Sequence, residues 1–147
     1  MDMISHSTQE TIDIAERLGS LLQNGDVLIL KGDLASGKTT FTKGIGKALH
    51  IKEVINSPTF TILKIYQGDH TLFHIDAYRL ENNLYDLGID EYQPEGITVI
   101  EWPEYYETFL PKEFLEISIT ETDEEERDIR FIPHGERYEE IVKEMTC

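Results

Sequence analysis

Cysteine is almost absent from this chain, because its 147 residues include a single one, Cys147 at the last position. One cysteine cannot form an intrachain disulfide, so we do not expect a fold stapled by disulfides. No apolar run approaches the roughly 18 residues that a membrane-spanning helix needs, and the first residues carry no basic leader followed by an apolar stretch. We therefore expect a soluble protein of a reducing compartment, the cytoplasm.

Basic residues are also scarce, at 13 Lys and Arg against 29 Asp and Glu, for a net charge of -16. Such a surface repels phosphate backbones, so we do not expect direct binding of nucleic acid. The charge is uneven: residues 27–64 hold six lysines and two acids (+4), and residues 101–128 hold eleven acids and two basic residues (-9). The first segment suits a small anion. The second suits either a basic partner or solvent.

Hydrophobic periodicity predicts alternating helices and strands. Ser7 to Glu10 form an S-x-x-E capping box before a helix over 8–23. The other predicted elements are strands over 27–30, 59–66, 71–75, 97–100, 114–120 and 127–133, a helix ending at 49, a short helix over 81–87 and a terminal helix over 136–145. The length and this alternation predict one domain over 1–147, an α/β sandwich whose sheet is parallel at its centre and antiparallel at an edge.

Residues 32–39, Gly-Asp-Leu-Ala-Ser-Gly-Lys-Thr, match the P-loop pattern G-x-x-x-x-G-K-[ST]. Glycines let such a loop curve so that its backbone amides face a phosphate, and the helix that follows adds its positive dipole end. In this pattern Lys38 would reach the β- and γ-phosphates, and the Thr39 hydroxyl would ligate magnesium. The expected strand before the motif and helix after it favour a nucleotide site over an incidental glycine turn.

Two acids, Asp76 and Glu101, stand where predicted strands end. Ligands gather at the carboxyl ends of parallel strands, so either acid could hold magnesium or its water ligands. Thr59 lies where nucleotide switches place a threonine that senses the γ-phosphate. Trp102 follows Glu101 directly and would either pack in the core or shape the site. Arg79 would either touch phosphate or form a salt bridge.

The absence of certain motifs limits the reactions that this chain is expected to catalyse. There is no N-K-x-D sequence to recognise guanine, which counts against a GTPase. Five arginines are few for a small-molecule kinase, because arginine's planar fork suits phosphate recognition. The five histidines show no metal-ligand spacing, so we expect them to be structural or at the surface. Two alternatives to an ATPase stay open: a small-molecule kinase, and a nucleotide-gated binding module that needs no hydrolysis.

Four motifs occur in order along the chain: Gly-Asp-Leu-Ala-Ser-Gly-Lys-Thr-Thr at 32–40, Ser-Pro-Thr-Phe at 57–60, His-Ile-Asp-Ala-Tyr-Arg-Leu at 74–80 and Glu-Trp-Pro at 101–103. Together they resemble the TsaE family of bacterial ATPases, which helps to make threonylcarbamoyladenosine in tRNA. The resemblance covers nearly the whole chain. One departure is Ala35, where the family usually has glycine; alanine is the next smallest residue, so we expect a small effect.

The resemblance implies a three-layer α/β sandwich related to P-loop NTPases, with ATP and magnesium as ligands. It implies that Thr39 and Glu101 hold magnesium and that Asp76 has a Walker B-like role nearby. The adenine would lie between the segment around Thr8 and the turn at Glu126 and Arg127. The phosphates would rest on the backbone amides of Ala35, Ser36, Gly37, Lys38, Thr39 and Thr40.

The resemblance also implies partners, TsaB and TsaD, which transfer the threonylcarbamoyl group to the adenosine beside the anticodon. ATP would be hydrolysed when the chain is bound to that pair, and slowly by the chain alone. tRNA would be reached only through the complex, which agrees with the acidic composition.

Overall fold

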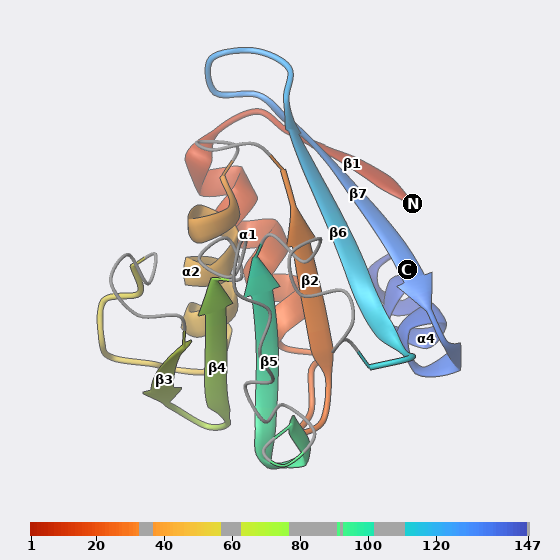
Figure 1. The fold of residues 1–147 in the computed structure, drawn as a ribbon. Coiled ribbons are helices and arrows are strands. Elements are labelled where there is room, and N and C mark those ends of the chain that lie inside the picture. The colour runs from red at the N-terminus through yellow and green to blue at the C-terminus, as the bar shows by residue number, and fades with distance from the viewer. Residues whose placement is uncertain (33–36, 57–62, 77–90, 92, 102–110, 147) are drawn as a thin grey trace, which may run out of the picture.

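The computed structural model describes residues 1–32, 37–56, 63–76, 91, 93–101 and 111–146 (Figure 1). Several expectations fall outside these residues: the helix over 81–87, and the placement of Ala35, Ser36, Thr59, Arg79 and Trp102. Among the described residues, no helix has both the length and the apolar character needed to cross a membrane.

A seven-stranded mixed sheet forms the centre of the molecule (Figure 1). Four strands, β6, β2, β5 and β4, run parallel at its centre. The predicted α/β sheet with a parallel centre is confirmed, and antiparallel pairs lie at both edges, β1–β7–β6 and β3–β4. Across the sheet the strands are β1 (Asp2–Ser5), β7 (Arg127–His134), β6 (Phe114–Glu121), β2 (Val27–Lys31), β5 (Gly96–Glu101), β4 (Thr71–Asp76) and β3 (Leu63–Gln67).

Three helices, α1 (Thr8–Gly19), α2 (Lys38–Ala48) and α4 (Glu136–Met145), lie behind the sheet in Figure 1. One apolar core joins all three to alternate residues of the strands, such as Leu28 and Leu30 of β2. The intervening Ile29 is also buried. It lies on the opposite face of the sheet, where its register partner in β5 is Ile100. A short 3-10 helix, η2 (Gln93–Glu95), leads into β5. The third layer predicted for the sandwich is not found among the described residues.

Glycines let α1 and α2 pack closely. A Cβ built on Gly44 would lie 2.5 Å from the Cβ of Ala15, and one on Gly19 would lie 2.6 Å from the Cβ of Ala48. Real Cβ atoms do not approach so closely, so only glycine permits this helix spacing. The contact holds the P-loop helix against α1 and the sheet.

Near the N-terminus, one helix end and one strand differ from the sequence prediction. Helix α1 ends at Gly19, not at 23, and the carbonyl of Leu21 accepts a hydrogen bond from Arg137 Nη2 at 2.9 Å. Strand β1 was not predicted, because four residues with one exposed apolar side chain, Ile4, give no clear period. It exists because its backbone pairs with β7, with Met3 opposite Ile129.

One of the two hydrogen bonds predicted for the capping box is present, and the other goes to a different residue. Ser7 Oγ accepts the backbone N–H of Glu10 at 3.1 Å, which caps α1. The carboxylate of Glu10 accepts a hydrogen bond from the backbone N–H of His6, at 3.1 Å, and not from that of Ser7. The free amide that the box satisfies is therefore one residue earlier than expected.

Candidate nucleotide-binding site

A helix follows the P-loop motif, as predicted, and runs from Lys38 to Ala48, one residue short of the predicted end. Gly37 is the N-cap of α2 and has φ 109°, a left-handed conformation that disfavours residues with a side chain. The first intrahelical hydrogen bond runs from Phe41 N to Gly37 O at 2.8 Å. The amides of Lys38, Thr39 and Thr40 precede it and have no helical acceptor, so the helix N-terminus is suited to an anion.

Lys38 is drawn back over the loop that precedes it. Its side chain is 5% exposed, and Nζ donates to the carbonyl of Gly32 at 2.7 Å. Thr42 Oγ1 donates to the Lys38 carbonyl at 3.0 Å, within the first turns of α2. The ammonium is thus held beside the start of the P-loop, where it can pair with a phosphate.

The two predicted acids lie side by side. Asp76 ends β4 and Glu101 ends β5, and the two are register partners in parallel strands. Glu101 is also level with Leu30 of β2, the strand that leads into the P-loop. Asp76 is 9% exposed and Glu101 is 3% exposed. The carboxyl ends of three neighbouring strands therefore bring two buried carboxylates and the P-loop to one edge of the sheet.

This set of groups fits magnesium held together with nucleotide phosphates. Two neighbouring buried carboxylates repel each other, and a divalent cation between them would offset that repulsion. Within the described ranges, no three His, Cys, Asp or Glu side chains form a group that could hold a metal ion. Magnesium does not need such a cage, because it usually binds one or two carboxylates, waters and phosphate oxygens.

Sequence reasoning missed a third residue at this edge, His74. Its Nε2 is hydrogen-bonded to Oε2 of Glu101, and both side chains are buried. The spacing of the histidines could not indicate this contact, because the two residues are 27 positions apart. The available signal was strand alternation, which puts His74 and Asp76 on one face of β4.

The two walls predicted for the adenine also come together. His6 Nδ1, two residues before Thr8, lies 3.4 Å from Oε2 of Glu126. A Cβ on Gly37 would be 3.8 Å from Nε of Arg127, so this arginine lies beside the P-loop. Its Nη1 donates to three carbonyls of the turn between β6 and β7, those of Asp123, Glu124 and Glu126. Arg127 is therefore held by this turn and lies beside the P-loop.

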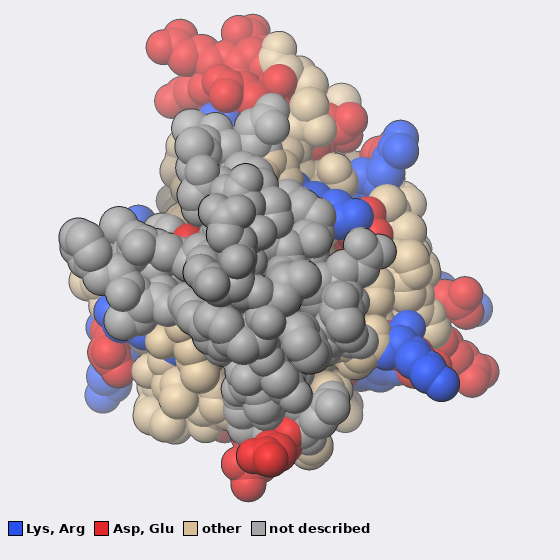
Figure 2. All heavy atoms as spheres, viewed as in Figure 1, with Lys and Arg blue, Asp and Glu red and all other residues tan. Residues whose placement is uncertain are grey.

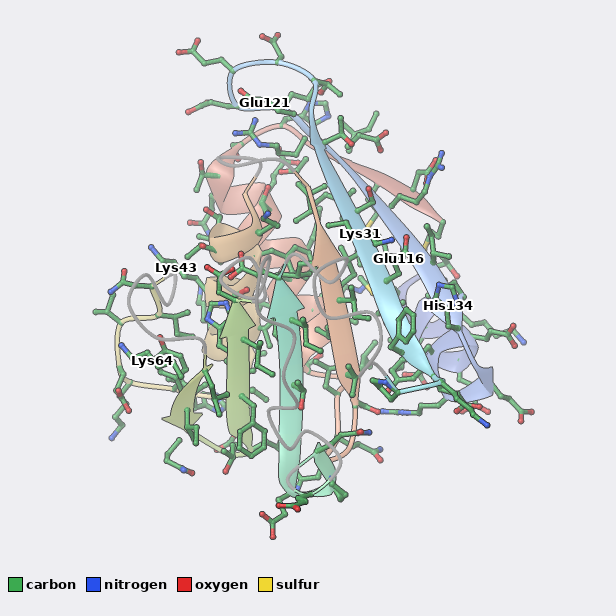
Figure 3. All side chains as sticks on the ribbon, in the orientation of Figure 1. Lys31, Lys43, Lys64, Glu116, Glu121 and His134 are labelled. Atoms are coloured by element: carbon green, nitrogen blue, oxygen red, sulfur yellow. The ribbon has the colours of Figure 1, made fainter. Side chains whose placement is uncertain are left out.

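The acidic and basic segments occupy different parts of the surface. Figure 2 shows acidic side chains gathered over the β6–β7 turn at the top of the view, where Figure 3 labels Glu121. Lys43 and Lys64 lie on the other side, beside α2 and β3 (Figure 3). Lys31 pairs with Glu116 at 3.7 Å, and Lys47 pairs with Glu16 at 3.5 Å, so part of the predicted positive charge is neutralised locally.

A groove of about 260 Å³ lies beside α2, but not at the P-loop. It is formed by the later part of α2 and residues 51–55. It is therefore separated from Lys38, which is the first residue of that helix. We therefore assign the candidate site to the carboxyl ends of β2, β4 and β5, and not to this groove. The groove is lined by Lys43, Gly46, Lys47, Ile51, Glu53, Val54 and Ile55.

The chain matches known proteins over most of its length. Residues 5–129 match the model of a family described as Threonylcarbamoyl adenosine biosynthesis protein TsaE. Two relatives are named tRNA threonylcarbamoyladenosine biosynthesis protein TsaE. The one from Bacillus subtilis (strain 168) is 45% identical over 94% of this chain and 89% of its own. The one from Treponema pallidum (strain Nichols) is 41% identical over 88% of this chain and 98% of its own.

The fold is similar to that of a solved structure. A crystal structure of Bacillus subtilis YdiB superposes with a TM-score of 0.87 at 38% sequence identity. The match covers 99% of this chain and 93% of that one.

Proposed function

Because this chain belongs to the TsaE family, we propose that it acts in the biosynthesis of threonylcarbamoyladenosine in tRNA as the component that binds and hydrolyses magnesium-ATP. One observation supports this most: the P-loop lysine, Lys38, lies at the same sheet edge as the buried carboxylates Asp76 and Glu101. In such sites catalysis consists largely of positioning and charge neutralisation. The whole of 1–147 would act as one nucleotide-binding domain.

The phosphates of ATP would rest on the amides of Ala35 to Thr40, with Lys38 on the β- and γ-phosphates. Thr39 and Glu101 would hold magnesium, with Asp76 beside them. When bound, that ion neutralises charge on the phosphates. Asp76 or Glu101 would orient the attacking water, and Thr59 would close over the γ-phosphate.

The nucleoside end of ATP would lie towards α1 and the β6–β7 turn. Thr8 stands at the exposed start of α1, and Glu126 and Arg127 end the turn. The contact between His6 and Glu126, at 3.4 Å, supports this placement because the two segments are neighbours in the fold. Trp102 would shape the site next to Glu101.

The partners in this proposal are TsaB and TsaD, and tRNA is met only through the complex they form. The net charge of -16 supports an indirect role towards tRNA, because most of the surface repels a phosphate backbone. Hydrolysis would be slow for the chain alone and faster when the pair docks. The reaction would take place in the cytoplasm, where tRNA is modified.

The proposal is tested by phosphate release from magnesium-ATP, measured for the purified chain alone and with a TsaB–TsaD pair. We expect a large increase with the pair, dependent on magnesium. Negligible phosphate release both without and with the pair would contradict the assignment as an ATPase. Label from γ-³²P-ATP appearing on a metabolite would indicate a kinase instead. A variant that binds ATP without hydrolysing it, and still supports full tRNA modification, would indicate a nucleotide-gated binding module.

A further inference from the structure

His74 is a fully buried imidazole that the proposed reaction does not use. It lies on β4 two residues before Asp76, and its side chain is 0% exposed. Strands β4 and β5 are neighbours at the centre of Figure 1, and their register places Asp76 opposite Glu101. His74 therefore lies on the same face of the sheet as both carboxylates, two residues before the carboxyl end of β4.

The contact between His74 and Glu101 leaves part of the carboxylate free. Nε2 of His74 is bonded to Oε2 of Glu101. A carboxylate has two oxygens and about four lone-pair positions, so Oε1 can still accept another ligand. One oxygen held by a buried, rigid imidazole limits rotation of the Glu101 side chain. The other oxygen is then kept at the sheet edge, beside Asp76.

The second ring nitrogen of His74 indicates which group is the donor. Among the described residues, Nδ1 is buried and has no hydrogen-bond partner. A proton there would be a buried donor without an acceptor, which is costly, whereas a bare lone pair costs less. The tautomer with its proton on Nε2 therefore fits best, and in it His74 donates to Oε2 of Glu101.

We propose that His74 is a positioning residue that holds Glu101 in the orientation needed to bind magnesium with ATP. The inference rests on the proposed function, because it assumes that Glu101 is a magnesium ligand. Carboxylates that bind metals are themselves commonly held by hydrogen bonds, and loss of such a partner typically lowers metal affinity about 10- to 100-fold. His74 takes no part in the chemical step and acts only through Glu101.

The test compares His74→Leu, which has no donor, with His74→Gln, whose amide can donate to Glu101. Thr98→Val is the matched control, because Thr98 Oγ1 is also buried without a partner among the described residues but lies on the other face of the sheet. Isothermal titration measures ADP affinity with magnesium and with EDTA. Electron paramagnetic resonance of Mn²⁺ measures metal binding in the presence of ADP.

For His74→Leu we expect about 10- to 100-fold weaker Mn²⁺ binding, with ADP affinity in EDTA changed less than about 2-fold. The magnesium concentration for half-maximal phosphate release should rise similarly, while the maximal rate at saturating magnesium changes much less. His74→Gln should recover most of the metal affinity. Thr98→Val should match the wild type, since it leaves Glu101 untouched.

Metal affinity of His74→Leu equal to that of the wild type would overturn the inference and leave the proposed function standing. If His74→Leu does not fold, His74→Asn replaces it, because its amide is one methylene shorter and cannot reach Glu101. Equal metal affinity of the Gln and Asn variants would then overturn the inference. A wild-type chain that binds no ADP in either condition would overturn both the proposed function and the inference.

Discussion

At the scale of single residues, the structure concentrates its unusual groups at the carboxyl ends of β2, β4 and β5. Lys38, Asp76 and Glu101 are ionisable side chains that are less than a tenth exposed. Residues of these types are rarely buried unless they have partners or a function. Nζ of Lys38 donates to the backbone carbonyl of Gly32 at 2.7 Å, so this buried amine has a polar partner at the start of the P-loop.

Lys38→Ala tests this site most directly. We expect phosphate release in the presence of TsaB and TsaD to fall by at least about 100-fold, because a charge that stabilises the transition state is lost. Loss of the hydrogen bond from this charged side chain to the Gly32 carbonyl should cost about 1.5 to 3 kcal/mol of stability. Urea unfolding checks the stability. Lys43→Ala, on an exposed part of the same helix, should keep wild-type turnover. Wild-type turnover by Lys38→Ala would contradict the P-loop assignment.

At the scale of elements, α4 is fastened to the sheet by two polar contacts. The hydroxyl of Tyr138 is buried, and its Oη accepts a hydrogen bond from the backbone N–H of Val27 at 2.9 Å. Arg137 binds both oxygens of Asp26, at 3.2 and 2.9 Å, and this hydrogen-bonded carboxylate raises the pKa of Arg137. These contacts join residues 111 positions apart. They place α4 against the segment that enters β2.

Tyr138 makes the stability of the fold depend on pH. Burial raises the pKa of Tyr138 to about 12, above its usual value of 10.0. Above pH 10 the unfolded chain therefore loses this proton before the folded chain does, so stability falls as pH rises through 10 to 12. From this group alone the loss is about 1.4 kcal/mol by pH 11.

Tyr138→Phe separates that effect from other titrations. At pH 8 it should be less stable than the wild type by about 1 to 3 kcal/mol, because the Val27 N–H is left without a partner. The difference should shrink by about 1.4 kcal/mol at pH 11, where only the wild type carries the penalty. Urea unfolding at both pH values measures it. A difference that stays constant with pH would contradict the argument.

At the scale of the whole molecule, negative charge is the dominant surface property. The end of β6 and the turn that follows it are exposed and acidic (Figure 2), with Glu121, Asp123, Glu124 and Glu125 in five residues. Like charges at this spacing repel one another in the folded state at low salt. The turn also holds Arg127 by its backbone carbonyls, so its acidity lies next to the candidate site.

Replacing Glu124 and Glu125 by Gln should therefore stabilise the fold. We expect a gain of about 0.5 to 1 kcal/mol at low salt. The gain should vanish near 1 M salt, where the screening length is about 3 Å. Urea unfolding at both salt concentrations measures it. Lys52→Gln, which removes an exposed positive charge, should shift stability in the opposite direction. A gain that does not depend on salt would show that charge is not the cause.

Local patterns determined a large part of this protein. The P-loop motif indicated that a helix follows the loop, and periodicity located α4 at 136–145 and most strands within one or two residues. These features depend on neighbours in the chain: glycine at a left-handed position, or apolar side chains repeating along one element. The family was recognisable for the same reason, because its motifs are short and occur in order.

Only the tertiary structure decided which elements meet. Strand β1 exists through its pairing with β7, and α1 stops at Gly19, where Ala48 of α2 lies too close for a side chain. The pairing of Asp76 with Glu101 follows from β4 lying beside β5, and the contact of His74 with Glu101 follows from the register of that pair. Such contacts depend on packing between residues far apart in the chain, and no local pattern encodes them.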